Sequence, residues 1–200
     1  MDRLILREDL EETQPTVSGR TLTIRICTYN RIYRTGGAGR TVTRERVLPG
    51  AFREPLARPR GALRFRHVGE RPGDVDSLEN FYGVLTALRE DGAALLGDFE
   101  VFEGAREDKL LRLVESGAVT GASMTAVIKG DKKTRDAAGP ITDITRVSHL
   151  DAVSITPKPA YDDAGVLAIR EELDPEAATR RAARVAQERA YWATVAVPGR

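Results

Sequence analysis

Residues 82–101 read YGVLTALREDGAALLGDFEV, two apolar runs separated by a polar turn at 89–92. An Asp-Gly pair between two such runs is a strong local signal for a β-hairpin, because both residues tolerate the left-handed backbone of a tight hairpin turn. The pattern therefore predicts two neighbouring antiparallel strands, at 82–88 and 93–101. The middle of the chain is expected to lie in an antiparallel sheet.

Several patterns precede this hairpin. Apolar and polar residues alternate over 21–27 and again over 63–66, just before His67, and a period of two is typical of a half-buried strand. Between these runs, the stretch 31–46 combines a Gly-Gly-Ala-Gly run with five arginines, which we interpret as a mobile arginine-rich loop. Punctuation by Pro and Gly within 47–52 predicts a turn into a short helix.

Other patterns follow the hairpin. Apolar residues spaced three and four apart over 105–117, with acids first and a glycine last, predict an amphipathic helix of about three turns. Small and β-branched residues over 119–128 predict a strand. A Lys- and Asp-rich turn at 130–139 then separates this strand from 141–156, which is long enough for one bent strand or two. The run 166–169 predicts a last strand.

Together these elements indicate an α+β fold that is mainly antiparallel β, in a barrel-like or sandwich-like arrangement with one to three helices. We expect three parts: a polar N-terminal segment at 1–18, one folded domain at 19–170, and a tail at 171–200. The tail is rich in Ala and Arg, with acids first and bases last, which suits a helix dipole. It is predicted to be a helix used for docking or self-association.

Composition excludes several classes of protein. The 200 residues include 31 Lys and Arg against 30 Asp and Glu, so no overall field favours nucleic acid or an acidic membrane. The single Cys27 excludes an internal disulfide framework and a cysteine-rich zinc site, and we expect it to be a packing residue. No apolar stretch approaches the roughly 18 residues of a membrane span. The charged N-terminus is not that of a secretory signal, so we expect a protein that stays inside the cell.

Three side chains are candidates for chemistry. His67 and His149 are the two histidines of the chain, and His67 is the better candidate for a general base because a position at a strand end can face a cleft. Ser123 is a candidate nucleophile, since a serine and its base are brought together by the fold and not by adjacency in sequence. The structural alternative is that His67 only hydrogen-bonds within a strand and that Ser123 only packs against a close backbone.

Four motifs occur in an informative order. They are Val47-Leu48-Pro49-Gly50-Ala51-Phe52, the His of Arg66-His67, the Gly-Ala-Val-Thr-Gly-Ala-Ser-Met of 117–124, and Val153-Ser154-Ile155-Thr156 followed by Pro159-Ala160-Tyr161 and Ala164. In this order they resemble the prohead proteases of tailed bacteriophages, a family related to the herpesvirus assemblins. The resemblance spans roughly residues 19–170. Each motif alone is moderately specific, and the ordered co-occurrence is the specific part.

The resemblance implies a serine endopeptidase with an assemblin-like β-barrel. It implies that Ser123 attacks the scissile carbonyl, that His67 accepts its proton and later returns it to the leaving amine, and that a third group orients the imidazole. The implied substrates are scaffold and major capsid protein segments, and the chain itself, inside the procapsid in the host cytoplasm. The family also suggests a homodimer. We expect no cofactor, no metal and no membrane partner.

The third catalytic group does not follow directly from the motif. The family has an acidic residue or a His immediately before the Val of the fourth motif, where this chain has Ala152. Asp151 and His149 are the neighbours, and alternation along a strand places both on the face opposite Ala152 and Ser154, unless a bulge intervenes. We favour Asp151, with His149 or a Ser-His pair plus water as alternatives. Since 157–163 lacks the arginine pair of the assemblins, backbone amides are the expected oxyanion donors.

Two other functions are compatible with parts of the sequence. Ala152 is what a capsid-associated, scaffold-like relative would have if it kept the barrel and lost full catalysis. Arginines interleaved with an aromatic residue over 58–66 suggest a β-barrel that binds nucleic acid. The balanced charge, the aromatic content of 6% and the lack of a recognisable reading motif argue against this second function.

Overall fold

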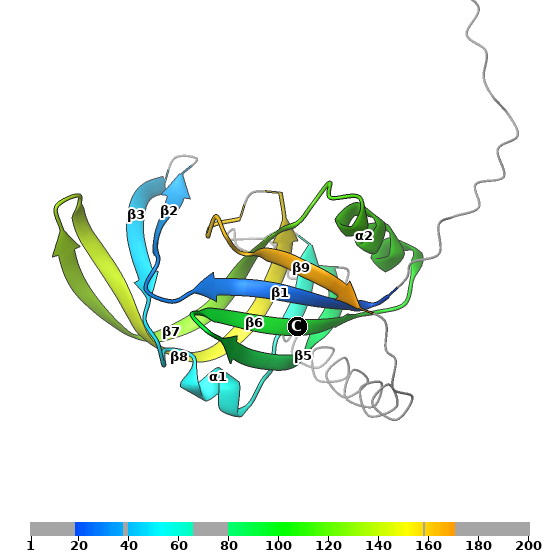
Figure 1. Ribbon diagram of the computed structural model, residues 1–200, viewed down its shortest axis with the longest axis horizontal. Coiled ribbons are helices and arrows are strands. Elements are labelled where there is room, and N and C mark those ends of the chain that lie inside the picture. Colours follow the sequence, from blue (N-terminus) through cyan, green and yellow to red (C-terminus); the bar gives the residue numbers. More distant parts are fainter. Residues whose placement is uncertain (1–18, 38–39, 66–79, 158, 171–200) are drawn as a thin grey trace, which may run out of the picture.

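The computed structural model describes residues 19–37, 40–65, 80–157 and 159–170, and the elements below belong to this part of the chain. The strands are β1 (Thr21–Thr28), β2 (Ile32–Gly37), β3 (Arg40–Val47), β4 (Ala62–Phe65), β5 (Phe81–Asp91), β6 (Ala94–Val101), β7 (Gly121–Asp136), β8 (Gly139–Thr156) and β9 (Gly165–Arg170). The helices are α1 (Arg53–Ala57) and α2 (Ala105–Glu115) (Figure 1).

The strands form one sheet in the order β2-β3-β8-β4-β5-β6-β1-β9-β7. A further pairing of β7 with β8 closes the strands from β8 to β7 into a seven-stranded barrel, and β2 and β3 continue the sheet outside it. Most pairings are antiparallel, while β8 runs parallel to β3 and to β4. The predicted α+β fold with a mainly antiparallel barrel and flanking helices is confirmed.

The central hairpin is present as predicted. β5 and β6 pair antiparallel up to Asp91 and Ala94, and Gly92 in the turn has a φ of 57°. That left-handed backbone suits glycine, which has no Cβ to clash. The predicted strands at 21–27, 63–66 and 166–169 are β1, β4 and β9, and the predicted amphipathic helix is α2.

The arginine-rich loop expected at 31–46 is wrong. Most of these residues form β2 and β3, which pair with each other, and β3 also pairs with β8. Two of the arginines form ion pairs with carboxylates on the β7–β8 pair. Arg46 binds Asp143 at 2.8 Å, and Arg44 binds Asp136 at 2.6 Å. These partners lie 97 and 92 residues away in the chain, so no local pattern indicates the pairing.

The turn predicted at 130–139 is wrong in its extent. β7 continues to Asp136, β8 begins at Gly139, and β8 is one strand with several register shifts against β7. This strand pair extends past the barrel and lies near β2 and β3 (Figure 1). The outer part of β7 is polar and exposed at most positions, so the alternation that marks a half-buried strand is missing there.

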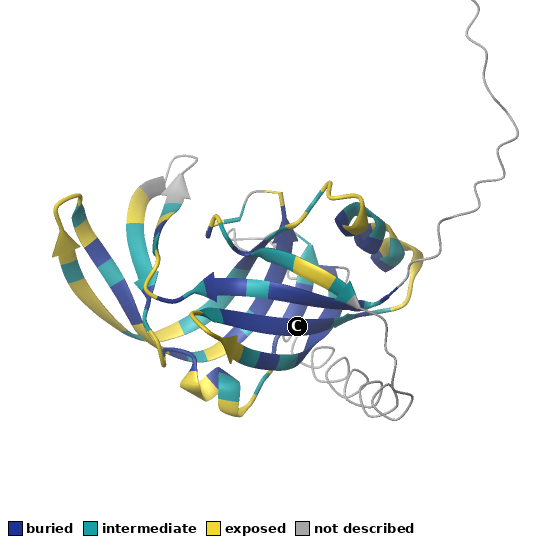
Figure 2. Cartoon of the chain, viewed as in Figure 1, coloured by how far each residue is buried: buried dark blue, intermediate teal, exposed yellow. Residues whose placement is uncertain are grey.

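The core fills the inside of the barrel (Figure 2). Side chains such as Leu22, Leu85 and Phe99 are completely buried there. The turn before α1 adds Phe52, and α2 covers one side with an apolar stripe. Cys27 is fully buried in the same core, where burial raises the pKa of its thiol to about 12 and keeps it protonated.

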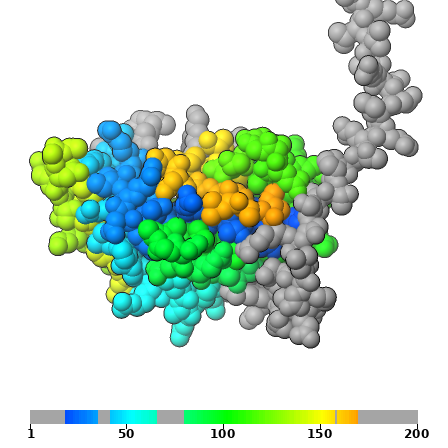
Figure 3. Space-filling model, viewed as in Figure 1, coloured from blue at the N-terminus to red at the C-terminus, as the bar shows by residue number. Residues whose placement is uncertain are grey.

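The space-filling view shows β9 lying against β1, and the β5–β6 hairpin against the same strand (Figure 3). Residues 1–18 and 171–200 lie outside the described residues, so the three-part division and the helical tail stay predictions. Among the helices of the described residues, none has the length and hydropathy to cross a membrane.

Candidate active site

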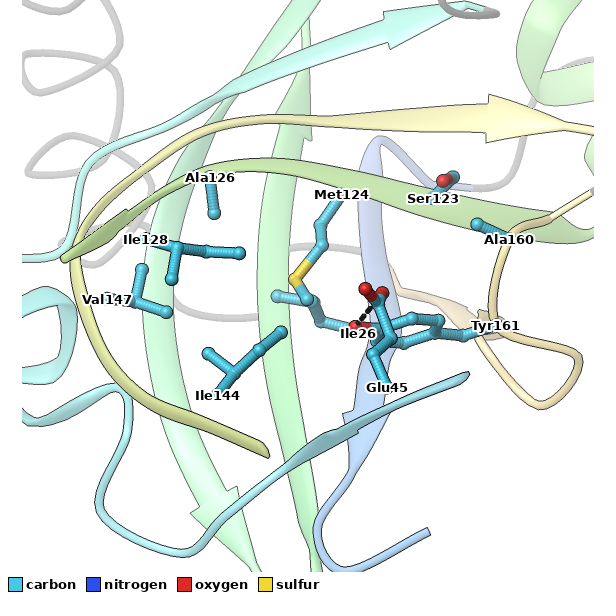
Figure 4. Close-up of a pocket in the computed structure, with 10 residues that line it drawn as sticks. All are labelled: Ile26, Glu45, Ser123, Met124, Ala126, Ile128, Ile144, Val147, Ala160 and Tyr161. Carbon is cyan, nitrogen blue, oxygen red and sulfur yellow. Dashed lines mark hydrogen bonds between the residues drawn. The ribbon is translucent and has the colours of Figure 1, made fainter. Parts of the chain in front are cut away.

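Ser123 lies near the start of β7 and is 6% exposed. Its neighbours Ala122 and Met124 pack with the barrel core. Because side chains alternate along a strand, Ser123 is directed to the outer face of the barrel. Figure 4 shows Ser123 and Met124 on opposite sides of β7.

Three strands contribute to the row of side chains that contains Ser123. Ser123 pairs with Ser154 of β8, and Ser154 pairs on its other side with Arg64 of β4. A small apolar cluster of Ala62, Phe81 and Ala152 packs separately from the main core, and the Arg64 guanidinium lies 4.9 Å from the Phe81 ring centroid. Ser154, in the middle of this row, is almost completely buried.

Ala152 occupies the expected place of the third catalytic group, and it is completely buried against Ala62 and Phe81. Its methyl group can neither accept nor donate a hydrogen bond. Any orienting group for the imidazole must therefore come from another position on this face.

A β-bulge in β8 decides where Asp151 lies. Thr125 pairs with Ala152 and the next residue, Ala126, pairs with Leu150, so Asp151 is an extra residue in β8. The expectation that alternation separates Asp151 and His149 from the face of Ala152 is corrected by this bulge. His149 pairs with Val127, which lies between two positions that face the pocket and core, so its side chain is on the outer face.

Asp151 and His149 contact each other on that outer face. His149 Nε2 is 3.2 Å from Asp151 Oδ1, and His149 Nδ1 is 3.0 Å from the Ser148 hydroxyl. The two side chains are 59% and 33% exposed, so both are accessible to solvent. The Asp151 carboxylate is therefore placed to accept a hydrogen bond from an imidazole.

Position along the strands separates the two candidates. His149 lies opposite Val127, four positions from Ser123, which is about 14 Å at about 3.4 Å per residue. Asp151 lies in the bulge between the rows of Thr125 and Ala126, which is about 7–10 Å along the strand from Ser123. In a triad the imidazole separates the nucleophile from the acid. The distance between Asp151 and Ser123 along the strand leaves room for one imidazole ring between them. His149 lies further from Ser123, by about the width of another ring.

A pocket of about 120 Å³ lies on the core side of β7, beside Ser123. Figure 4 shows Met124 pointing into it, with the carboxylate of Glu45 entering from β3. Ser123 is also one of the lining residues, and the remaining walls are mostly apolar, from Ile26, Ala126, Ile128, Ile144, Val147, Ala160 and Tyr161.

Tyr161 connects this pocket to the loop before β9. Its hydroxyl donates a hydrogen bond to Glu45 Oε1 at 2.7 Å, and its ring stacks on Tyr33 at 3.8 Å between centroids. Burial and the nearby Glu45 carboxylate raise the pKa of Tyr161, so the hydroxyl stays protonated and acts as a donor. Tyr33 in turn donates to Asp163 at 2.9 Å, which holds the loop against β2.

Comparison with known protein families gives one match. The family model of the Caudovirus prohead serine proteases matches residues 9–178, most of the chain. The chain belongs to this family. It is therefore a member of a family of serine peptidases that mature phage procapsids, which implies capsid or scaffold substrates inside the host cell. Comparison with curated protein sequences gives no match.

In this prohead protease, His67 lies outside the described residues, and so its position relative to Ser123 stays a prediction. The described chain before it ends at Phe65, which pairs with Ile155, and Ile155 pairs with Ala122 next to Ser123. β4 therefore ends two residues before His67, in the ladder row that neighbours the row of Ser123.

Two residues of the prohead protease pocket were not found as site residues from the sequence. Glu45 was interpreted as part of an arginine-rich loop, and Tyr161 only as part of a family motif. The alternation of Glu45 with Arg44 and Arg46 is the signal that could have separated the faces of this strand. Within the described residues, no group of three or more His, Cys, Asp or Glu is arranged to hold a metal ion.

Proposed function

We propose that this prohead protease is a serine endopeptidase that cleaves scaffold and major capsid protein segments, and itself, inside the procapsid in the host cytoplasm. The observation that carries the proposal is the placement of Ser123. It lies on the outer face of a paired strand, one ladder row from the end of β4, and β4 leads directly to His67. We expect no cofactor, and a homodimer as the working form.

In the proposed mechanism, the Ser123 hydroxyl attacks the carbonyl carbon of the scissile bond while His67 removes its proton. The imidazolium then gives this proton to the leaving amine, and water repeats the sequence on the acyl-enzyme. The strand pairing of Ser123 with Ser154 restricts the nucleophile to one position before substrate binds. Backbone amides supply the hydrogen bonds to the oxyanion.

Asp151 is the proposed third member, and His149 is the alternative. The bulge in β8 brings the Asp151 carboxylate to the face of Ser123, and its distance from Ser123 along the strands suits one intervening imidazole. His149 is already in contact with Asp151 and supports the carboxylate from the side away from Ser123. Asp151 would orient the ring of His67 and stabilise its positive charge.

The test is self-cleavage of the full chain. Wild type and Ser123→Ala are expressed, purified and incubated, and the masses of all fragments are measured over time. We expect trimmed species from wild type and none from Ser123→Ala, because the alanine has no nucleophile. Ser116→Ala is the matched control, since Ser116 is exposed at the end of α2 and its hydroxyl donates a hydrogen bond to Leu113 O of the same helix. Identical fragments from wild type and Ser123→Ala would refute the assignment.

The alternative is a capsid-associated relative with the same barrel and weakened or lost catalysis. The observation that favours it is Ala152, which is buried and has no functional group where the family has an acidic residue or a His. A folded wild-type chain that cleaves neither itself nor capsid and scaffold proteins would support this alternative. Loss of one orienting group slows a triad without abolishing its activity, so the assay needs long incubation.

A further inference from the structure

The pocket beside Ser123 lies in a seam of the barrel. β7 and β9 share a single residue pair, Gly121 with Gly165, so the described ladder between them stops where β7 passes Ser123. Ile26 of β1 and Met124 of β7 face each other across the seam, and they wall the pocket. Exposed residues of the lining, Ile128 and Ala160, place its mouth at the surface.

The charge in this pocket is not balanced within the described residues. Glu45 Oε1 accepts the hydrogen bond from Tyr161, a neutral donor, and no described Lys or Arg makes an ion pair with the carboxylate. Its neighbours on β3, Arg44 and Arg46, point to the other face of the strand and bind Asp136 and Asp143. An acid next to apolar walls attracts a cation with an apolar stem.

We propose that this pocket binds a Lys or Arg side chain of the peptide substrate, with Glu45 as the residue that determines this specificity. The methylene stem packs against Met124 and the apolar wall, and the cationic head binds Glu45. Because Ser123 is itself one of the residues that line the pocket, the bound side chain belongs to a residue close to the scissile bond. The proposal rests on the proposed protease function, since the occupant is a substrate.

A neutral side chain in the same place would be disfavoured. It would remove water from the Glu45 carboxylate and offer no charge in return, and a buried, uncompensated charge is costly. The pocket therefore selects against isosteric neutral residues as well as for cationic ones. Glu45 does not touch the reacting bond, so it affects which peptide binds and not the chemistry.

Binding can be measured without cleavage because the chain has two methionines, Met1 and Met124. The full chain is labelled with ¹³C in the methionine methyl groups, and the Met124 signal is followed while N-acetyl-arginine methylamide is added. The same titration is run with the citrulline analogue, which has nearly the same shape and no charge. Met1 is the internal reference.

We expect the arginine probe to shift the Met124 signal. The citrulline probe should bind at least about tenfold more weakly than the arginine probe. Glu45→Gln should weaken the arginine probe to the same extent, because Gln keeps an acceptor for Tyr161 and loses the charge. Glu54→Gln is the matched control, since Glu54 is an exposed acid on α1 that pairs with Arg146 outside the pocket. Equal binding of the two probes to wild type would overturn the proposal, even if Glu45→Gln does not fold.

A second arm uses cleavage. A mixture of peptides is digested with the wild-type chain, and the residues flanking each cut bond are identified by mass spectrometry. We expect Lys or Arg at one fixed position near the cut bond, and a fall of about tenfold or more in kcat/KM for these peptides with Glu45→Gln. Cleavage that depends on Ser123 but shows no preference for a cation would refute the pocket proposal alone. Absence of Ser123-dependent cleavage would refute the proposed function, and the binding arm would still decide the pocket.

Discussion

Asp151 shows how one extra residue changes what a strand presents. In a regular strand it would face away from Ala152, and the bulge in β8 turns it to the same side. The acid reaches the outer face one position before Ala152, which is where the resemblance led us to expect the third group. Because Asp151 supplies the carboxylate on this face, position 152 does not need a polar side chain. Ala152 packs instead against Phe81.

The two candidates for the third group can be separated by mutation. Asp151→Asn is expected to lower kcat about a thousandfold or more, because an orienting carboxylate fixes the tautomer and the charge of the base. His149→Ala is expected to lower kcat by less than about tenfold, since His149 contacts the Asp151 carboxylate and the Ser148 hydroxyl and lies further from Ser123 than Asp151 does. Cleavage rates are measured across a range of pH, because a merely structural residue would leave the shape of the pH profile unchanged.

Circular dichroism and the melting temperature of both variants serve as the control for folding. If Asp151→Asn kept the wild-type rate and pH profile while His149→Ala lost most of the cleavage rate, His149 and not Asp151 would be the third catalytic group. Full activity in both variants would leave a Ser-His pair without a protein-derived third member.

At the scale of elements, the β2–β3 pair is held to the β7–β8 pair by ionic hydrogen bonds. Arg46 binds both oxygens of Asp143, at 2.8 and 2.9 Å, and Thr134 of β7 donates to the same carboxylate at 2.8 Å. The Asp143 side chain is only 3% exposed. The Arg46 guanidinium and Thr134 lower the pKa of Asp143 below its ordinary value, because both bind the charged form.

Asp143→Asn is expected to lower the free energy of unfolding by about 1–2 kcal/mol at pH 7. A carboxyl with a lowered folded-state pKa stabilises the fold above its unfolded pKa of about 3.9, and the contribution is lost as pH falls through the folded pKa. The difference between wild type and variant should therefore shrink below about pH 4. Urea unfolding at a series of pH values measures it.

Asp131→Asn is the matched control for this experiment. Asp131 lies on the same strand as Thr134 and pairs with Lys133 at 3.4 Å on an exposed surface, so its loss should cost less than about 0.5 kcal/mol. A difference for Asp143→Asn that stays constant down to pH 3 would contradict the ionic explanation.

At the scale of the whole molecule, the barrel closes next to the nucleophile. Gly121 starts β7, pairs with both Thr156 and Gly165, and immediately precedes the Ala122-Ser123 pair. A Cβ at Gly121 would lie 2.5 Å from the Thr156 carbonyl oxygen and 2.8 Å from Pro159 Cδ, both closer than real contacts allow. Closure of the barrel at this point therefore depends on glycine, and it also determines the position of Ser123.

Gly121→Ala is expected to destabilise the fold by about 1–3 kcal/mol and to reduce the cleavage rate even where the protein stays folded. The physical reason is that β7 must move away from Thr156 or Pro159, and Ser123 moves with it. Gly92→Ala is the comparison, because its Cβ meets nothing within 4 Å and only the positive φ is strained. It should cost about 1 kcal/mol and leave the rate unchanged. Equal rates for the two variants would argue against the link between closure and Ser123.

Local patterns in the sequence were enough for the elements whose two faces differ. In β1 and α2 the apolar side chains that pack in the core lie mainly on one face, so they repeat with the period of a strand or a helix, and the Asp-Gly turn marks the β5–β6 hairpin. The ordered motifs were enough for the family. The assignment of Ser123 and His67 as a working pair was inferred from those motifs and stays a prediction.

Periodicity and ordered motifs are local properties, so the sequence alone was enough to predict a mainly antiparallel β-barrel of the prohead protease family. The folded chain was needed to show that β3 pairs with β8, that a bulge turns Asp151 to the face of Ser123, and that Glu45 enters the pocket beside it. Each of these depends on contacts between residues far apart in the chain. Register and long-range ion pairs arise from the packing of the whole barrel, and no short stretch of residues encodes them.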